Sequence, residues 1–439
     1  MVRVRESIEC CSETQQQTDA LTSAGNSQSK ITMQHRKRIP PAEAIQYLDS
    51  LLQDLHGQPE SATAANACGR VLAKSIVSDV SIPAFRRSMM DGFAVHAADT
   101  SSADESSACT LRIVGTSMPG NGWTGNLQSG EAVRVMTGAP VPEAADAVIP
   151  FELTTTLPAG VRISSPIAAG KNVSEIGEDI RSGQQLLEAG RSLRPQDIGL
   201  LSATGCSEIT VIRRPRIRLI ITGSELLPAG TRPHGHRIAD SNGPMLEALV
   251  SRDGGTSLFH GITPDNPDTI RELLEEGLRD EADVLLVSGG SSAGDEDFAP
   301  DLIAQLGELP VHGISMRPGA PAGIGRIGNC PVFLLPGNPV ACLFAYDMFA
   351  ARAVRQLGGR PQQWPYQPIE STLLKPLHSA IGRLDYARVR MSEEGIMPIA
   401  ISGGSVLSST TVADGFVLIP PETDRISAGD TARMWLYGG

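Results

Sequence analysis

The spacing of apolar residues divides the chain into segments of different expected structure. Between residues 42 and 55, Ile45 and leucines at 48, 51, 52 and 55 share one face, which predicts an amphipathic helix. From residue 61 to about 180 this periodicity fades, and glycine, proline and short apolar runs replace it. We therefore expect a separate, mostly β domain here, followed by a helix and a short strand within residues 189–211.

A regular alternation of buried strands and amphipathic helices begins at residue 215. Several short runs are wholly apolar, which is typical of parallel strands buried on both faces. The strands are expected at 217–221, 257–262, 284–287 and 332–335. Helices are expected at 244–250, 267–278 and 340–354, and Asn266 and Asn338 are suitable N-caps for the last two. After residue 361 the pattern returns to short strands separated by glycine turns.

These changes predict a multidomain fold of mixed α/β and β content. A polar, disordered tail is expected first, and the basic cluster after Met33 suggests that translation could begin there. The expected segments are a tail at 1–36, a linking domain at 37–60 and 182–213, an inserted β-rich domain at 61–181, an α/β domain at 214–360 and a β-rich domain at 361–439.

Composition excludes several classes of function. The formal charge of −12 argues against a nucleic-acid-binding protein and against binding to an anionic membrane surface. No apolar run approaches the ~20 residues of a membrane helix. The seven cysteines are scattered and contain no C-x-x-C pair, so we expect reduced thiols in a cytoplasmic protein.

Candidate chemistry lies where three of the expected strands end. Polar glycine turns follow them at 222–225, 288–297 and 336–339, and parallel strands bring such turns to one edge of a sheet. Backbone amides in these turns suit a phosphate or oxyanion, while Asp295, Glu296 and Asp297 suit Mg²⁺. Each turn alone is equally compatible with a simple strand-to-helix connection. The P-loop and dinucleotide-binding motifs are both missing from the sequence.

Taken in order, the polar motifs resemble the molybdopterin molybdenumtransferase family, which includes MoeA and the E domain of gephyrin. The matching stretches are 88–95 (SMMDGFAV), 136–142 (MTGAPVP), 177–180 (GEDI), 222–226 (TGSEL), 288–290 (SGG) with Asp297, 317–319 (RPG) and 335–340 (LPGNPV). Arg383, Arg388 and Gly404-Ser405 resemble the C-terminal pattern of the family.

The resemblance implies a fold, a reaction and partners. It implies a three-layer αβα domain that binds molybdopterin, an inserted β-rich domain and a C-terminal β-barrel. It also implies a homodimer whose cleft combines the α/β domain of one subunit with the inserted domain of the other. The implied reaction converts adenylated molybdopterin and molybdate to molybdenum cofactor and AMP with Mg²⁺, and a molybdopterin adenylyltransferase would supply the substrate.

The resemblance also assigns roles to residues of this chain. The catalytic and Mg²⁺-holding carboxylates would be Asp297, Glu225 and Asp179, with Asp91 completing the cleft from the other subunit. Molybdate would bind to Arg317, Arg388 and Ser405, because the arginine fork fits an oxyanion. The remaining substrate-binding residues would be Ser88, Thr137, Asp283, Gly289, Gly290, Ser291, Pro336, Gly337 and Asn338.

Four positions depart from the family pattern. Arg317 and Ala320 stand where the family usually has lysines, and Gly313 replaces another lysine four residues before Arg317. Ala341 stands at a common serine position. Two interpretations are open: a working insertase with fewer positive charges, or a non-catalytic or specialised paralogue that binds the pterin. A generic nucleotide hydrolase is a third, disfavoured by the missing Walker lysine.

Overall fold

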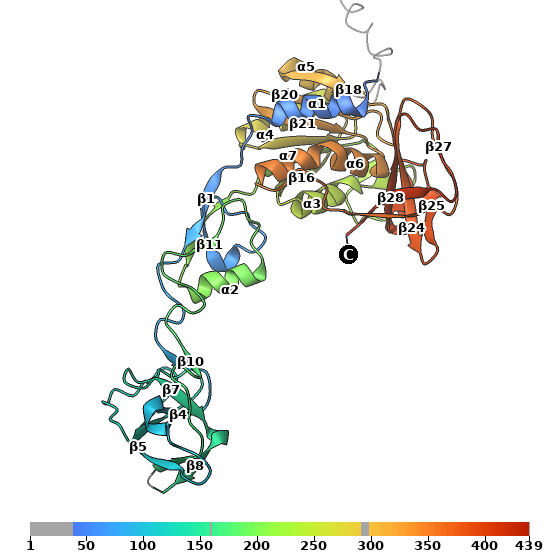
Figure 1. Ribbon diagram of the computed structural model, residues 1–439. Helices are drawn as coiled ribbons and strands as arrows, with labels where there is room; N and C mark the ends of the chain where they lie inside the picture. Colours follow the sequence, from blue (N-terminus) through green and yellow to red (C-terminus); the bar gives the residue numbers. More distant parts are fainter. Residues whose placement is uncertain (1–37, 159, 291–297, 439) are drawn as a thin grey trace, which may run out of the picture. The chain divides into compact units, whose positions relative to one another are not determined.

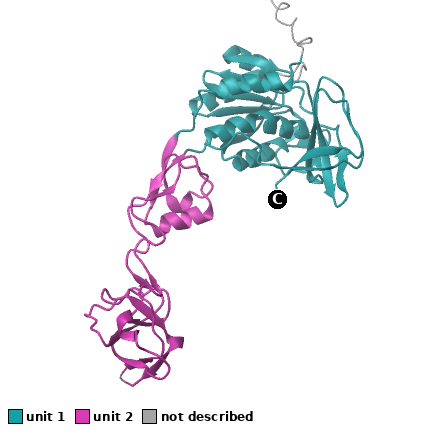
Figure 2. Ribbon diagram, viewed as in Figure 1, with its two compact units in different colours: residues 1–58, 213–439 teal, residues 59–212 magenta. Residues whose placement is uncertain are grey.

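The computed structural model describes residues 38–158, 160–290 and 298–438, and it divides the chain into two compact units. Unit 1 comprises residues 1–58 and 213–439, and unit 2 comprises residues 59–212 (Figure 2). The expected tail at 1–36 and the alternative start at Met33 lie outside the described residues.

Unit 1 contains a six-stranded sheet that matches the alternation of buried strands in the sequence (Figure 1). Its strand order is β16 (Thr256–Thr263), β13 (Arg216–Thr222), β17 (Val284–Ser288), β21 (Cys330–Leu335), β20 (Gly323–Ile327) and β18 (Glu308–His312). The first four strands are parallel, and the last two pair antiparallel. All five positions of β17 are buried, as expected for a strand covered on both faces.

Alternate residues of β13 point into two different hydrophobic cores. Ile217, Leu219 and Ile221 join one core, while Ile220 joins the other. The first core includes α1 (Pro41–Leu52), α3 (Asn242–Arg252), α6 (Pro339–Ala345) and α7 (Ala351–Leu357). The second includes α4 (Pro267–Arg279) and α5 (Ala299–Leu306). Helices therefore cover both faces of this sheet.

The position of α1 differs from the expected linking domain. Leu48 and Leu52 are buried in the same core as β13 and α3, within unit 1. The backbone just before α1 also pairs with the α/β part, because Ile39 forms a bridge with Ile314. An amphipathic pattern shows that a helix buries one face, but it does not show which partner covers that face.

The C-terminal part of unit 1 is a second sheet, linked to the first part through a short strand. Its order is β19 (Met316–Arg317), β24 (Leu384–Ser392), β26 (Gly415–Ile419), β28 (Thr431–Leu436) and β22 (Gln367–Thr372), and β25 (Gly395–Ala400) pairs with β24. Since β19 belongs to the sequence of the α/β part, its pairing with β24 ties the two parts together.

Unit 2 contains the β-rich insertion. Its sheet has the order β7 (Ala147–Pro150), β4 (Gly92–Val95), β6 (Glu131–Val135), β5 (Cys109–Ser117), β9 (Gly160–Ile163) and β8 (Thr154–Leu157). The ends of the insertion pair with each other, because β1 (Pro59–Thr63) lies antiparallel to β12 (Glu208–Ile212). Helix α2 (Pro195–Ala203) shares a hydrophobic core with β12. The expected multidomain fold of mixed α/β and β content is therefore confirmed.

Short 3-10 helices are present at η1 (Ala64–Asn66), η2 (Ala97–Thr100) and η3 (Phe151–Leu153). Other short elements also belong to the described chain. They are β2 (Ile76–Val77), β3 (Arg87–Ser88), β10 (Val173–Ser174), β11 (Gln185–Leu187), β14 (Leu226–Leu227), β15 (Ile238–Ala239), β23 (Leu377–His378), β27 (Arg425–Ile426) and α8 (Ser408–Thr411). Among the described helices, none has the length and apolar content needed to cross a membrane. The five cysteines in the described residues are free thiols.

Candidate functional site

The three glycine turns predicted from the sequence line one pocket of about 900 Å³ in unit 1. Gly223 and Glu225 follow β13, Gly289 and Gly290 follow β17, and residues 337–339 follow β21. All three strands are parallel, so their carboxyl ends meet at one edge of the sheet. The buried Pro336 leads into the last turn without lining the pocket.

Close backbone contact explains why a glycine is needed at the middle turn. Gly289 has a φ of +96°, and an added Cβ would lie 2.2 Å from the carbonyl oxygen of Thr222. The Cβ of a residue at 337 would be 3.7 Å from the Cα of Gly289, which is an ordinary contact distance. The floor of the pocket is therefore built from backbone segments packed directly against one another.

Asn242, which was not predicted from the sequence, connects two of these turns. Its Nδ2 donates to the Ser288 hydroxyl at 3.0 Å and to the Gly337 carbonyl at 2.8 Å. Within the described part of the chain, its Oδ1 is buried without a hydrogen-bond partner, as are the hydroxyls of Thr222 and Thr263. The feature that could have identified Asn242 from the sequence is its position at the start of α3, directly after β15.

Three described carboxylates line the pocket. Glu225 is exposed, while the Asp265 carboxylate accepts a hydrogen bond from the Ser224 amide at 2.8 Å. Asp240 is buried and accepts from the amides of Asn242 and Gly243, at the first turn of α3. Neither aspartate was predicted from the sequence. Asp265 was identifiable, because it follows β16, the fourth parallel strand, at the same edge of the sheet.

A loop from the C-terminal part completes the pocket. Ser405 and Leu407 line it, and the Gly404 carbonyl accepts from the amide of Val340 at 2.8 Å and, more weakly, from that of Ala341 at 3.4 Å. These two amides belong to the first turn of α6, where intrahelical acceptors are missing. The loop is thus fixed against the helix that begins in the pocket.

The two arginines expected at the molybdate site both contact protein groups in this structure. Arg388 is fully buried and donates to the Ser409 hydroxyl and the Tyr386 carbonyl, each at 3.1 Å, and to the Ser402 carbonyl. Burial lowers its pKa. Arg317 pairs with Asp385, its neighbour across the β19–β24 pairing. Neither arginine is among the described residues that line the pocket.

Asp283 is not part of this pocket. It precedes β17, and its carboxylate accepts from Arg213 at 2.8 and 3.0 Å and from the Arg216 amide at 2.7 Å. The glycine turn is at the other end of this five-residue strand, about 17 Å away at the usual rise of a strand.

A second pocket, of about 600 Å³, gathers the site candidates of unit 2. Ser88, Thr137 and Asp179 line it together with Arg87 and Glu178. The Ser88 hydroxyl is engaged in the local turn, where it donates to the Met90 carbonyl at 2.5 Å and accepts from the Met90 amide at 3.3 Å.

Asp91 lies beside this second pocket, held by Thr137. The carboxylate accepts from the amide of Thr137 at 2.6 Å and from its hydroxyl at 2.7 Å. These bonds stabilise the ionised carboxylate and lower the pKa of Asp91. An exposed, ionised acid is thereby held in a defined orientation.

The expected metal ligands are divided among unit 1, unit 2 and the residues outside the described ranges. Glu225 belongs to unit 1 and Asp179 to unit 2, while Ser291, Asp295, Glu296 and Asp297 lie outside the described residues. Within the described ranges, no group of three or more His, Cys, Asp or Glu residues could hold a metal ion.

Comparison with known proteins covers most of the chain. Family models match at residues 39–205 (MoeA N-terminal region, domain I and II), 218–356 (probable molybdopterin binding domain) and 370–437 (MoeA C-terminal region, domain IV).

Whole-length relatives agree with these matches. Molybdopterin molybdenumtransferase of Haemophilus influenzae is 30% identical over 384 residues, covering 86% of this chain and 93% of that protein. Molybdopterin molybdenumtransferase 2 of Mycobacterium tuberculosis is 32% identical over 388 residues, with 86% and 95% covered. The crystal structure of a molybdopterin biosynthesis MoeA protein from Pyrococcus horikoshii superimposes with a TM-score of 0.78 at 32% identity, covering 92% of this chain and 100% of that one. With a shared fold, near-complete coverage and its strand-end turns gathered in one pocket, the chain belongs to the molybdopterin molybdenumtransferase (MoeA) family.

Proposed function

We propose that this protein is a molybdenum insertase. It transfers molybdate to adenylated molybdopterin and releases AMP, which yields molybdenum cofactor. The observation that carries the proposal is the convergence of three strand-end turns and Ser405 in a single pocket of a chain that belongs to this family.

The pocket suits a phosphorylated substrate. Cleaving a pyrophosphate bond concentrates negative charge, so the site has to offer polar groups that are already oriented. The turns at Gly289–Gly290 and Gly337–Asn338 present small residues and backbone, and Ser405 of the C-terminal loop lines the same pocket. Asn242 holds two of the turns together, so these groups are fixed before the substrate arrives.

We further propose Mg²⁺ as the cofactor of the reaction. Carboxylate oxygens are the ligands that Mg²⁺ prefers, and Glu225 and Asp265 bring two carboxylates to the same pocket. Asp297 would complete the set from the segment outside the described residues. When bound, the ion would neutralise charge on the phosphates. Asp265 also orients the turn after β13, because its carboxylate accepts a hydrogen bond from the Ser224 amide.

The active form we propose is a homodimer. Asp91, Thr137, Ser88 and Asp179 share a polar pocket region in unit 2, and a second copy of the chain would bring this set to the substrate. Arg317 and Arg388 would bind molybdate only after exchanging some of their present protein contacts. The closed β-barrel and three-layer descriptions, the adenylyltransferase partner and the cytoplasmic location belong to the same proposal.

An AMP-release assay tests this function. Purified protein is mixed with adenylated molybdopterin, Mg²⁺ and molybdate, and AMP is measured against reactions without molybdate or without protein. We expect release that depends on both protein and molybdate. AMP at the level of the protein-free reaction would reject the insertase.

The variant Asp297→Asn tests the proposed role of Asp297 in binding Mg²⁺. It should abolish Mg²⁺-dependent AMP release, because an amide is a neutral and weaker ligand for a hard cation. The circular dichroism spectrum of this variant should match that of the native protein. Asp283→Asn is the control, since Asp283 lies at the opposite end of β17 and should not affect the Mg²⁺ dependence. An Asp297→Asn protein with the native rate would contradict the proposed role.

A further inference from the structure

A cluster of aromatic rings joins the two parts of unit 1. It contains two of the three tryptophans and three of the five tyrosines in a chain with only 4% aromatic residues. Ring centroids lie between 4.5 and 6.4 Å apart. The members are Phe344 in α6, Trp364 and Tyr366 in the segment before β22, and Tyr386, Phe416, Trp435 and Tyr437 in the C-terminal sheet.

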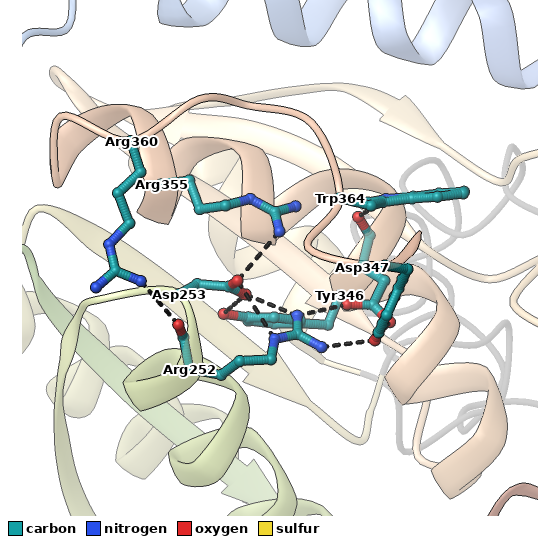
Figure 3. Close-up of polar contacts among 8 residues, drawn as sticks. Arg252, Asp253, Tyr346, Asp347, Arg355, Arg360 and Trp364 are labelled. Carbon is teal, nitrogen blue, oxygen red and sulfur yellow. Dashed lines mark hydrogen bonds and ion pairs between the residues drawn. The ribbon is translucent and has the colours of Figure 1, made fainter. Parts of the chain in front are cut away.

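A turn of π-helix lies between α6 and α7, at Tyr346–Ala350. Such turns change the backbone hydrogen bonding and are frequent at functional sites. Here the carbonyl of Asp347 accepts the indole N–H of Trp364 at 2.8 Å. The Asp347 carboxylate, 3% exposed, accepts from Arg252 at 2.7 Å (Figure 3). It also accepts from the Tyr366 hydroxyl at 2.8 Å.

A second buried carboxylate extends this network. Asp253 accepts from Arg252, from Arg355 at 3.1 Å and from the Tyr346 hydroxyl at 3.1 Å (Figure 3). Burial raises the pKa of Asp347, and the charge of Arg252 opposes this effect. Buried ion pairs contribute little net stability, but removing one partner leaves an unpaired group, so their geometry is strictly specified.

Helix α6 connects this network to the pocket. Its first turn includes Pro339, which lines the pocket, and the amides of Val340 and Ala341 donate to Gly404 of the C-terminal loop. The π-helical turn that follows α6 presents Asp347 to Trp364 and Tyr366. One short helix is thus attached to the C-terminal part of the chain at both ends.

We propose that Trp364 and Tyr366 are positioning residues. Through Asp347 and α6 they hold the Ser405 loop, residues 402–407, in its place at the pocket. The inference rests on the proposed function in assigning that loop to molybdate. Neither aromatic residue lines the pocket formed by the three glycine turns. Their effect passes through the Asp347 contacts, the helix and the Gly404 hydrogen bonds.

Trp364→Phe tests this with little change in packing. It removes the N–H donor to Asp347 and keeps an aromatic ring among Tyr366, Phe416 and Trp435. Trp435→Phe is the matched control, because Trp435 stacks on Phe416 at 5.6 Å within the same cluster. Two quantities are measured: amide hydrogen exchange of the peptide spanning Val340 and Ala341, and the KM for molybdate in AMP release.

We expect Trp364→Phe to raise both the exchange rate and the KM about 5-fold, with kcat nearly unchanged. A fivefold change corresponds to the ~1 kcal/mol of one buried hydrogen bond. Trp435→Phe should change neither quantity. Tyr366→Phe, compared with Tyr437→Phe, provides a second pair if Trp364→Phe fails to fold.

The outcomes separate this inference from the proposed function. Equal exchange rates in Trp364→Phe and Trp435→Phe would overturn the positioning role, as would faster exchange with an unchanged KM. If the native protein releases no AMP, the proposed function fails. The exchange comparison then decides by itself whether the aromatic network holds the loop.

Discussion

At position 289 the backbone adopts a φ of +96°, a conformation that side chains other than glycine rarely accept. The backbone carbonyl of Thr222 leaves no room for a Cβ and cannot move without shifting β13. Gly337, in the neighbouring turn, lies outside the left-handed region and has ordinary space. The two glycines line the same pocket but differ in what the fold demands of them.

Gly289→Ala should therefore lower the free energy of unfolding by at least about 2 kcal/mol, from backbone strain and overpacking. Gly337→Ala should change it by less than about 0.5 kcal/mol, as surface substitutions usually do. Urea denaturation of both variants measures the difference. Equal losses in the two variants would show that the close approach of the β17 turn to Thr222 does not constrain the fold.

Individual residues also show where the sequence was informative. The glycine turns were predictable, because small polar residues after a buried strand mark a sheet edge. Asp265 was identifiable by the same rule, because it follows the parallel strand β16, whereas the two turns that Asn242 joins come together only in the tertiary structure. Arg388 was expected to face an oxyanion, but its fully buried guanidinium donates to Ser409 and two carbonyls, which only tertiary structure reveals.

At the scale of elements, helix caps were predicted with mixed success. Asn266 caps α4 as expected, and its side chain accepts from the amides of Asp268 and Thr269 at 2.9 and 3.0 Å. Asn338 occupies the equivalent position of α6, but its side chain makes no capping hydrogen bond. The first turn of α6 instead bonds to Gly404, some sixty residues later in the chain, and local sequence cannot indicate such a partner.

Asn266→Ala should therefore cost about 1 kcal/mol of stability, the usual effect of losing a side-chain cap. Asn338→Ala should cost much less, because it removes no cap, although it changes the surface of the pocket. Thermal or urea unfolding of the two variants measures the contrast. A larger loss for Asn338→Ala than for Asn266→Ala would contradict this assignment of the caps.

The periodicity of apolar residues predicted where helices and strands lie better than it predicted which elements pack or pair with one another. The parallel strands were predicted because their apolar runs are continuous, and the structure buries every position of β17. The amphipathic face of α1 gave the helix but not its place in the core of unit 1. Pairing between strands as distant as β19 and β24 depends on tertiary context that no local pattern contains.

At the scale of the whole molecule, the hydrophobic cores of the described residues are divided between the two units. Each of the six cores found among the described residues draws its members from a single unit. The insertion leaves unit 1 after Gln58 and returns at Arg213, and the Arg213 amide donates to the Gln58 carbonyl at 2.6 Å. The first and last residues of unit 2, Pro59 and Ile212, are themselves paired in β1 and β12.

Residues 59–212 should therefore fold as an independent fragment, because its cores and its paired ends are all internal. We expect a cooperative thermal transition and a free energy of unfolding on the order of 5–15 kcal/mol. The remainder, with residue 58 joined to residue 213 by a few glycines and serines, should also fold, because closing so short a gap costs little entropy. Circular dichroism and calorimetry of both proteins measure these transitions. A fragment 59–212 that melts without cooperativity would show that unit 2 depends on unit 1 for its stability, despite having cores of its own.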